Sequence, residues 1–158
     1  MGALSGTAST EIDAPIDAVW AVVADVESAP DWQRGINAMR AIERDAGGRA
    51  TLADSVTDLK VKLFAARLAF CYEMPARLSW VQRRGDLAAL TGSWELEALG
   101  PSRTRATYAL HADPGTLLAR FVKGALEERL RATLVDGRPG ELAARVRRDE
   151  PGGPSTPP

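Results

Sequence analysis

The chain has 158 residues, of which 45% are hydrophobic and 26% are charged, and its formal net charge is −1. This length predicts one domain with a sizeable core, and the near-neutral charge argues against binding to nucleic acid or to anionic membranes. The sequence has no apolar run long enough for a spanning helix, no signal-peptide pattern and a single cysteine, Cys71, so we expect a cytoplasmic protein without stable membrane insertion or an intramolecular disulfide.

The first part of the chain is predicted to form one strand and two short helices. Residues 7–12 are β-prone and are expected at the edge of a sheet. Asp13 and Pro15 suit the cap and the first turn of a helix whose apolar positions continue to Val23. Ser28 is expected to cap a second short helix, which Gly35 would end.

Residues 36–111 predict six strands that follow one another through short turns. Alternation is clearest in residues 64–74, where the residues on one face are Phe64, Ala66, Leu68, Phe70 and Tyr72. Most of the turns contain glycine or proline, but neither residue marks the turn expected within residues 58–63. Short strands at such even spacing predict an antiparallel meander.

The C-terminal part predicts one long amphipathic helix over residues 113–135. Its apolar positions have the spacing of one helical face and are Leu118, Phe121, Val122, Ala125, Leu126 and Leu130. Asp113 and Pro114 are expected to begin this helix. Pro139, within the glycine-containing residues 137–140, predicts a kink or break after it, because proline removes a helical hydrogen bond.

These elements predict an α+β domain over residues 5–148, followed by a flexible Pro- and Gly-rich tail over residues 149–158. A curved, antiparallel, seven-stranded sheet would wrap around the long C-terminal helix, with the two short helices between strands 1 and 2. The long helix is the only element left to cover the apolar concave face of the sheet. This helix-grip arrangement is expected to leave a gap between sheet and helix, lined by inward side chains.

The order and spacing of several short segments resemble the START-like, or SRPBCC, helix-grip superfamily. The segments are Glu11-Ile12-Asp13-Ala14-Pro15, Val19-Trp20, Asp25-Val26-Glu27-Ser28-Ala29-Pro30-Asp31-Trp32, Leu78-Ser79-Trp80, Gly92-Ser93-Trp94-Glu95-Leu96 and Thr107-Tyr108-Ala109-Leu110. The chain is similar to bacterial proteins of the polyketide cyclase/dehydrase and coenzyme Q-binding types. Two features depart from the pattern: Ala29 stands where many members have an aromatic residue, and residues 137–140 interrupt a helix that is usually continuous.

Seven aromatic side chains are expected to bind ligand in the gap: Trp32, Phe70, Tyr72, Trp80, Trp94, Tyr108 and Phe121. Aromatic walls with a few hydroxyl groups suit a flat or extended apolar ligand. The same residues also fit a simple hydrophobic core, since aromatic stripes commonly serve packing.

Three side chains are candidates for catalysis: Tyr72, Tyr108 and Arg67. An inward Arg67 would stabilise an enolate, as basic groups do in related cyclases, but strand alternation points it outward. The single histidine, His111, and Cys71 also fall on the outward face, without a partner that the sequence places beside them. The chain lacks metal-ligand spacing and a glycine-rich phosphate loop, so no metal and no cofactor is expected.

Three functions remain open. The leading hypothesis is binding of a small hydrophobic ligand, such as a lipid, an isoprenoid quinone or a polyketide-like molecule, between the sheet and the C-terminal helix. The alternative is a polyketide cyclase or dehydratase that acts on a poly-β-carbonyl substrate in the same cavity. The third is an interaction module, which would expose an apolar patch instead of enclosing a cavity. The sequence is compatible with a monomer or a homodimer.

Overall fold

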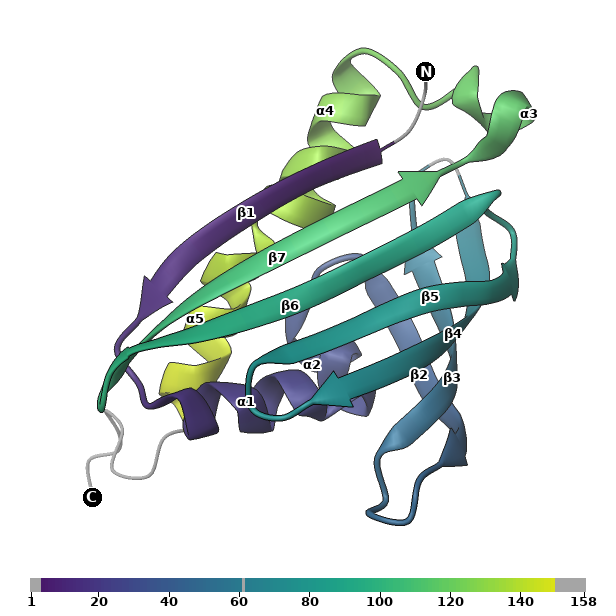
Figure 1. The fold of residues 1–158 in the computed structure, drawn as a ribbon. Coiled ribbons are helices and arrows are strands. Elements are labelled where there is room, and N and C mark those ends of the chain that lie inside the picture. The colour runs from purple at the N-terminus through teal and green to yellow at the C-terminus, as the bar shows by residue number, and fades with distance from the viewer. Residues whose placement is uncertain (1–3, 61, 150–158) are drawn as a thin grey trace, which may run out of the picture.

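The computed structural model describes residues 4–60 and 62–149, which form one seven-stranded antiparallel sheet with helices on its concave side (Figure 1). The strands are β1 (Leu4–Ile12), β2 (Ile36–Arg44), β3 (Ala50–Asp58), β4 (Leu63–Glu73), β5 (Arg77–Gly85), β6 (Ala89–Gly100) and β7 (Arg103–Asp113). Their order across the sheet is β1-β7-β6-β5-β4-β3-β2, so β2 to β7 form a meander and β1 is an edge strand beside β7. This arrangement confirms the predicted α+β helix-grip fold. Apart from Asp149, the predicted tail lies outside the described residues.

Two aspartates close hairpin turns of the meander. After β2, the Asp45 carboxylate accepts hydrogen bonds from the backbone N–H groups of Gly47 and Arg49, at 2.9 and 3.0 Å. After β3, the Asp58 carboxylate accepts the backbone N–H of Lys60 at 2.7 Å, and Lys60 has a positive φ of 72°. Aspartate stabilises turns in this way through its own side chain. The turn that glycine and proline do not mark therefore lies between the end of β3 and the start of β4.

The helices that follow β1 are α1 (Ile16–Ala24), a 3₁₀ turn (Val26–Ser28) and α2 (Ala29–Trp32). The predicted cap at Asp13 is wrong, whereas Ser28 occupies the predicted N-cap position of α2 without making a side-chain capping bond. Pro15 is the N-cap of α1, and the Asp13 side chain is 94% exposed. The Ser28 hydroxyl does not cap α2; it donates to the carbonyl oxygen of Asp25 at 2.7 Å and accepts the indole N–H of Trp32 at 3.2 Å. This second bond orients Trp32.

The single helix predicted over residues 113–135 is wrong in its N-terminal half. The observed elements are α3 (Gly115–Ala119), α4 (Ala125–Arg131), a π-helical turn (Ala132–Asp136) and α5 (Arg138–Asp149). Between α3 and α4 the chain leaves the helical conformation, and Gly124 has a φ of 64° and a ψ of −133°. Glycine adopts such a conformation readily because it has no Cβ. Apolar spacing continues across this break and so does not reveal it.

Residues 137–140, where the sequence predicted a kink or a break, do not break the helix, so of these two outcomes the structure excludes the break. The N–H of Gly137 donates to the carbonyl oxygen of Ala132 at 2.9 Å, and the N–H of Glu141 donates to the carbonyl oxygen of Gly137 at 3.1 Å. Pro139 falls in the first turn of α5, where a missing N–H costs little. From α4 to α5 the result is one bent helix. Neither it nor any other helix of the described residues is long and apolar enough to cross a membrane.

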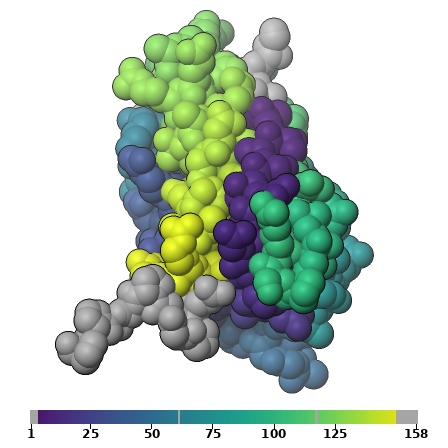
Figure 2. Space-filling model, turned by 90° about the vertical axis from the view of Figure 1, so that its left-hand side faces the viewer, coloured from purple at the N-terminus to yellow at the C-terminus, as the bar shows by residue number. Residues whose placement is uncertain are grey.

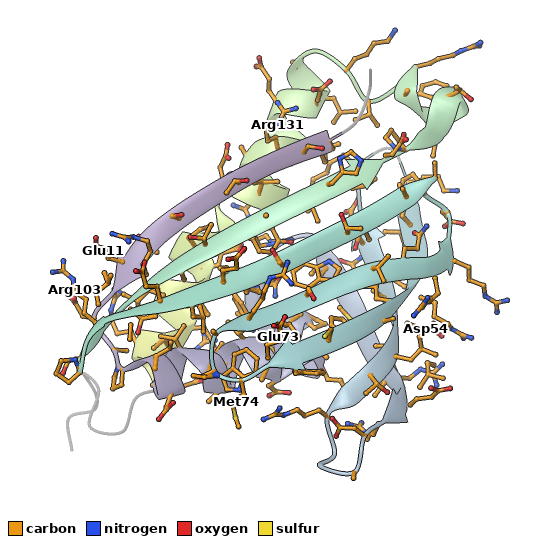
Figure 3. All side chains as sticks on the ribbon, in the orientation of Figure 1. Glu11, Asp54, Glu73, Met74, Arg103 and Arg131 are labelled. Atoms are coloured by element: carbon orange, nitrogen blue, oxygen red, sulfur yellow. The ribbon has the colours of Figure 1, made fainter. Side chains whose placement is uncertain are left out.

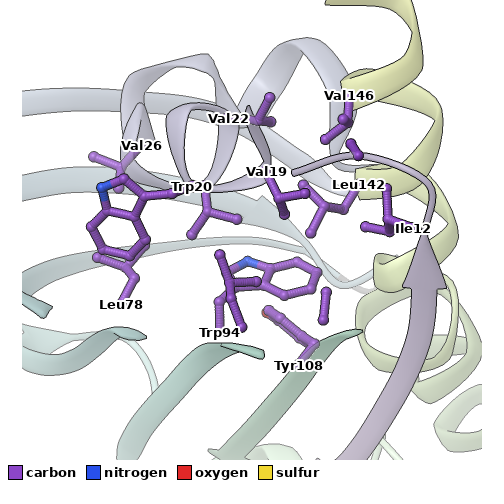
Figure 4. Packing of buried hydrophobic residues seen from close by; sticks show 14 of the residues in the cluster. Ile12, Val19, Trp20, Val22, Val26, Leu78, Trp94, Tyr108, Leu142 and Val146 are labelled. Atoms are coloured by element: carbon purple, nitrogen blue, oxygen red, sulfur yellow. The ribbon is translucent and has the colours of Figure 1, made fainter. Parts of the chain in front are cut away.

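The bent helix runs alongside β1 (Figure 2). Gly6 of β1 permits this close approach, because a Cβ atom there would lie only 3.1 Å from Cγ1 of Val135. Below α1, the core joins Val19, Trp94 and Leu142 from a helix, a strand and the bent helix (Figure 4). The helix is thus fixed to the sheet along one side, and the space that remains beneath it is the candidate site.

Candidate functional site

A cavity lies between the concave face of the sheet, α2 and the bent helix. Its volume is about 100 Å³, within a total empty space of about 930 Å³ that includes open solvent at the mouth. The wall is mostly apolar, and its two ends belong to different hydrophobic clusters. We call them the polar end, formed by Trp32, Trp94, Tyr108 and Arg138, and the apolar end, formed by Leu59, Phe64, Leu87 and Leu90.

Aromatic rings pack against one another at the polar end. The ring of Trp94 lies 4.7 Å from that of Tyr108 and 6.3 Å from that of Trp32, measured between centroids. The Trp80 ring lies 5.8 Å from Tyr108 and passes over Gly92, where any Cβ atom would overlap it. Trp94 and Tyr108 are paired across β6 and β7, so strand alternation turns both rings toward the bent helix (Figure 4).

Arg138 places a positive charge in this wall. Its side chain is only 2% exposed, and its Nη1 donates to the carbonyl oxygen of Arg34 at 2.8 Å and to the Glu141 carboxylate at 2.9 Å. The other Glu141 oxygen accepts the backbone N–H of Arg34 at 3.0 Å. The Nε of Arg138 is buried and has no hydrogen-bond partner among the described residues. A buried donor left unpaired costs about 1–3 kcal/mol, so the fold satisfies this guanidinium only in part.

The Tyr108 hydroxyl is a neutral neighbour of that charge. Burial raises the pKa of this phenol, and the positive charge of Arg138 opposes the rise without cancelling it. A neutral phenol can accept one hydrogen bond and donate another. The polar end therefore presents two donors, one charged and one neutral, to an oxygen atom placed in the cavity.

The four side chains that define the apolar end are hydrocarbon. Phe64 is 2% exposed and Leu59 is 7% exposed, and both pack in a cluster with Val122 from the segment between α3 and α4. Leu118 of α3 and Leu126 of α4 pack against the same cluster. The broken part of the C-terminal helix thus covers this end of the cavity, whereas the continuous part, through Arg138, covers the polar end.

Five of the seven predicted ligand-binding aromatics line the cavity. These five are Trp32, Phe70, Trp80, Trp94 and Tyr108. The structure brings them together from α2, β4, β5, β6 and β7, as strand alternation and the position of α2 predict. Their contact with a ligand stays a prediction.

The other two predicted aromatics, Tyr72 and Phe121, lie elsewhere. The Tyr72 hydroxyl donates to the carbonyl oxygen of Ala50 at 2.6 Å, and its ring lies 6.4 Å from Trp20, edge to face. Burial raises the pKa of Tyr72 to about 12. Phe121 is 60% exposed, because it falls in the non-helical segment before Gly124 and not on the inner face of a continuous helix. Neither side chain lines the cavity, which corrects the prediction.

Arg67 lies on the outer face of the sheet, as its strand parity indicates. Its Nε and Nη2 donate to the two carboxylate oxygens of Asp54, at 2.8 and 3.1 Å, and Asp54 lies on β3 (Figure 3). This pair holds the pKa of Asp54 below its ordinary value, through the hydrogen bond from Arg67. An arginine engaged in this way away from the cavity does not act on a bound ligand.

The remaining polar candidates are also on the outside. His111 is exposed, and its Nδ1 lies 2.6 Å from the Ser5 hydroxyl oxygen. Cys71 is exposed as well. Within residues 4–60 and 62–149, no group of three or more His, Cys, Asp or Glu side chains is placed to hold a metal ion.

Arg138 is the site residue that the sequence reasoning missed. The buried positions of the bent helix include a series that recurs every four residues: Leu130, Leu134, Arg138, Leu142 and Val146. Arg138 is therefore a charged residue within an apolar helical stripe. The signal was present, but the break expected near Pro139 removed residue 138 from that stripe.

The family profile described as polyketide cyclase/dehydrase and lipid transport matches residues 12–137. The chain belongs to this family. The match runs from the end of β1 to the residue before Arg138 and so includes most of the cavity wall. A comparison with curated protein sequences finds no match.

Solved structures share this fold at low sequence identity. The chain is similar to a START superfamily protein from Mycobacterium smegmatis, with 18% identity, a TM-score of 0.72, and coverage of 91% of this chain and 97% of that one. It is similar to the Zhui aromatase/cyclase from Streptomyces sp. R1128, with 18% identity, a TM-score of 0.74, and coverage of 96% and 98%. It is also similar to a protein from Thermus thermophilus, with 17% identity, a TM-score of 0.72, and coverage of 93% of this chain and 99% of that one. These similarities show the fold alone.

Proposed function

We propose that this protein binds a small hydrophobic ligand, such as a lipid, an isoprenoid quinone or a polyketide-like molecule, in the cavity beneath the bent helix. The observation that carries the proposal is a partly enclosed, mostly apolar cavity with aromatic walls and a few polar groups at one end. Small-molecule sites have this composition. The family description, which includes lipid transport, supports the same conclusion.

The proposal includes a cytoplasmic location and a monomer or homodimer with one domain over residues 5–148. We propose a class of ligand and not one compound. The apolar end recognises shape and hydrocarbon, and these do not distinguish a lipid tail from an isoprenoid or a polyketide.

Native mass spectrometry after mild purification, combined with displacement of the neutral fluorescent probe Nile red by candidate ligands, tests the proposal. Ala66 is buried in the cavity wall, whereas its neighbour Ala65 faces solvent. We expect Ala66→Phe to fill the cavity and weaken Nile red binding about ten-fold or more, while the matched control Ala65→Phe binds as the unmodified protein does. A protein that binds no apolar probe, or an Ala66→Phe variant that binds normally, would contradict the proposal.

A polyketide cyclase or dehydratase is the second candidate function, and the presence of Tyr108 and Arg138 in one wall favours it. Their donors would stabilise the enolate of a poly-β-carbonyl chain. In an assay with such a substrate, Tyr108→Phe is expected to change the product profile. Tyr72→Phe and Arg67→Ala are expected to leave it unchanged, because those side chains lie outside the cavity. Unchanged products for Tyr108→Phe would reject this function.

A further inference from the structure

Arg138 is a buried, positively charged residue in the wall of a mostly apolar cavity. Arg138 is 2% exposed and lines the cavity from the buried stripe of the bent helix, where leucine occupies the positions four residues before and four residues after it. A buried arginine is costly to keep unless its donors are satisfied. The question is how many of the N–H donors of Arg138 have a hydrogen-bond acceptor within the protein.

Two hydrogen bonds of Arg138 come from one nitrogen, Nη1, which donates to the Arg34 carbonyl oxygen and to Glu141. Burial raises the pKa of the Tyr108 phenol, and the guanidinium also lies close enough to its hydroxyl for a hydrogen bond from Arg138 to oppose that rise. The bonds from Nη1 connect α5 to the segment after α2 and account for part of the side chain. They leave Nε buried and without a partner among the described residues. A guanidinium carries five N–H donors and no acceptor, so its free donors can be satisfied only by an acceptor atom.

The Glu141 carboxylate pairs with the charge of Arg138 but accepts a hydrogen bond from only one of its nitrogens. Its side chain is 16% exposed, and it is shared between Arg138 and the backbone N–H of Arg34. Tyr108 also lies near the guanidinium, and its neutral phenol has a proton to donate. Tyr108 thus offers one donor beside the guanidinium, and Nε of Arg138 is a donor without a partner among the described residues, while the carboxylate of Asp25 is an acceptor elsewhere in the cavity wall.

We propose that the ligand of this cavity is an amphiphile with an oxyanion head, a carboxylate or a group of the same chemistry, which Arg138 and Tyr108 bind at the polar end while the hydrocarbon part lies toward the apolar end. The inference rests on the proposed binding function and specifies the class of its ligand. An oxyanion satisfies the free donors of the guanidinium, and hydrogen bonds between charged groups are the stronger ones. The wall of Leu59, Phe64, Leu87 and Leu90 accepts the chain.

A pair of probes that differ only in the head tests the inference: dansyl-undecanoic acid and its methyl ester, with Nile red as a neutral probe of the cavity. The unmodified protein is expected to bind the acid about ten-fold more tightly than the ester in a fluorescence titration. Arg138→Met keeps the length of the side chain but removes its donors, and is expected to bring the acid to the affinity of the ester. Nile red titration of the same variant reports whether its cavity still accepts a neutral apolar probe.

The matched control is Arg145→Met. Arg145 is on the same helix, is 18% exposed and pairs with Asp149, but it does not line this cavity. We expect Arg145→Met to keep the preference for the acid. Circular dichroism establishes whether each variant folds, and if Arg138→Met does not, the ratio of acid to ester affinity in the unmodified protein decides the question.

The outcomes separate the two proposals. Equal affinity for acid and ester, with Nile red bound, overturns the oxyanion head and leaves the binding function standing. A preference for the acid that survives Arg138→Met overturns the role of Arg138. Failure of all three probes to bind overturns the binding function and this inference with it.

Discussion

The two ends of the cavity are built differently. The polar end is closed by a continuous helix, by the hydrogen bond that Arg138 donates to the carbonyl oxygen of Arg34, by the one that the Arg34 N–H donates to Glu141, and by rings that pack on one another. The apolar end is covered by the short α3, a non-helical segment and the start of α4, and its contacts are between aliphatic and aromatic side chains. Directional bonds fix positions, whereas apolar contacts tolerate rearrangement. We therefore expect the polar end to orient a ligand and the apolar end to adapt to it.

The largest difference between the ends is expected from removing one ring at each. Trp94 and Phe64 are both 2% exposed and both line the cavity, but Trp94 also packs against the rings of Trp32 and Tyr108. Trp94→Ala should lower the free energy of unfolding by about 3–5 kcal/mol, and Phe64→Ala by less, because the wall around Phe64 loses fewer contacts. Urea unfolding of both variants measures this. Equal losses would show that the two ends are equally well packed.

A second test compares two glycines of β6. A Cβ atom at Gly92 would overlap the Trp80 ring, whereas nothing lies within 4 Å of a Cβ atom at Gly100. Gly92→Ala is expected to cost about 1–3 kcal/mol of stability, because Trp80 must leave its place beside Tyr108. Gly100→Ala is the control and should change stability by less than about 0.5 kcal/mol. A harmless Gly92→Ala would mean that the aromatic cluster is looser than its ring distances suggest.

The break in the C-terminal helix gives a third test, in which two similar substitutions have opposite signs. Gly124 has a positive φ of 64°, and Gly140 lies within α5 with open space around it. Gly124→Ala should destabilise the protein by about 1 kcal/mol, because a Cβ atom strains that backbone. Gly140→Ala should stabilise it by about 0.5–1 kcal/mol, as alanine does within helices. Thermal unfolding of the two variants compares them, and a shift in the same direction for both would argue against the break.

The smallest expected effect concerns the acid stability of the segment before α2. The backbone N–H of Ala41 and the guanidinium of Arg44 donate to the Glu27 carboxylate, at 3.0 and 2.7 Å, and lower its pKa below the ordinary 4.5. A lowered folded-state pKa adds stability above pH 4.5 that is lost as the pH falls through the folded-state value. Glu27→Gln should therefore lower the urea midpoint at pH 7 and lose this effect in acid. A difference that does not change with pH would contradict this explanation.

The sequence alone determined the succession of the strands along the chain and which face of β4, β5, β6 and β7 points inward. Alternation is a local property, so it correctly placed Phe70, Trp80, Trp94 and Tyr108 on the concave face and Arg67 on the outer one. Sequence patterns could also predict that a helix must cover that face. Each of these conclusions depends on the spacing at which side chains return to the same face of a strand or a helix, and this spacing is a local property of the backbone.

Only the tertiary structure decided where the C-terminal helix breaks and which polar groups reach the cavity. The positive φ of Gly124 and the continuity of the helix through Pro139 depend on packing against β1 and the sheet, and periodicity does not record them. Tyr72 does not line the cavity, because its hydroxyl donates a hydrogen bond to the carbonyl oxygen of Ala50, which is 22 residues away in the sequence. Arg138 lines the cavity and is held there by the hydrogen bond that it donates to the carbonyl oxygen of Arg34, 104 residues away in the sequence. Burial and hydrogen bonding between distant residues arise only when the chain has folded, and these interactions assemble the polar end.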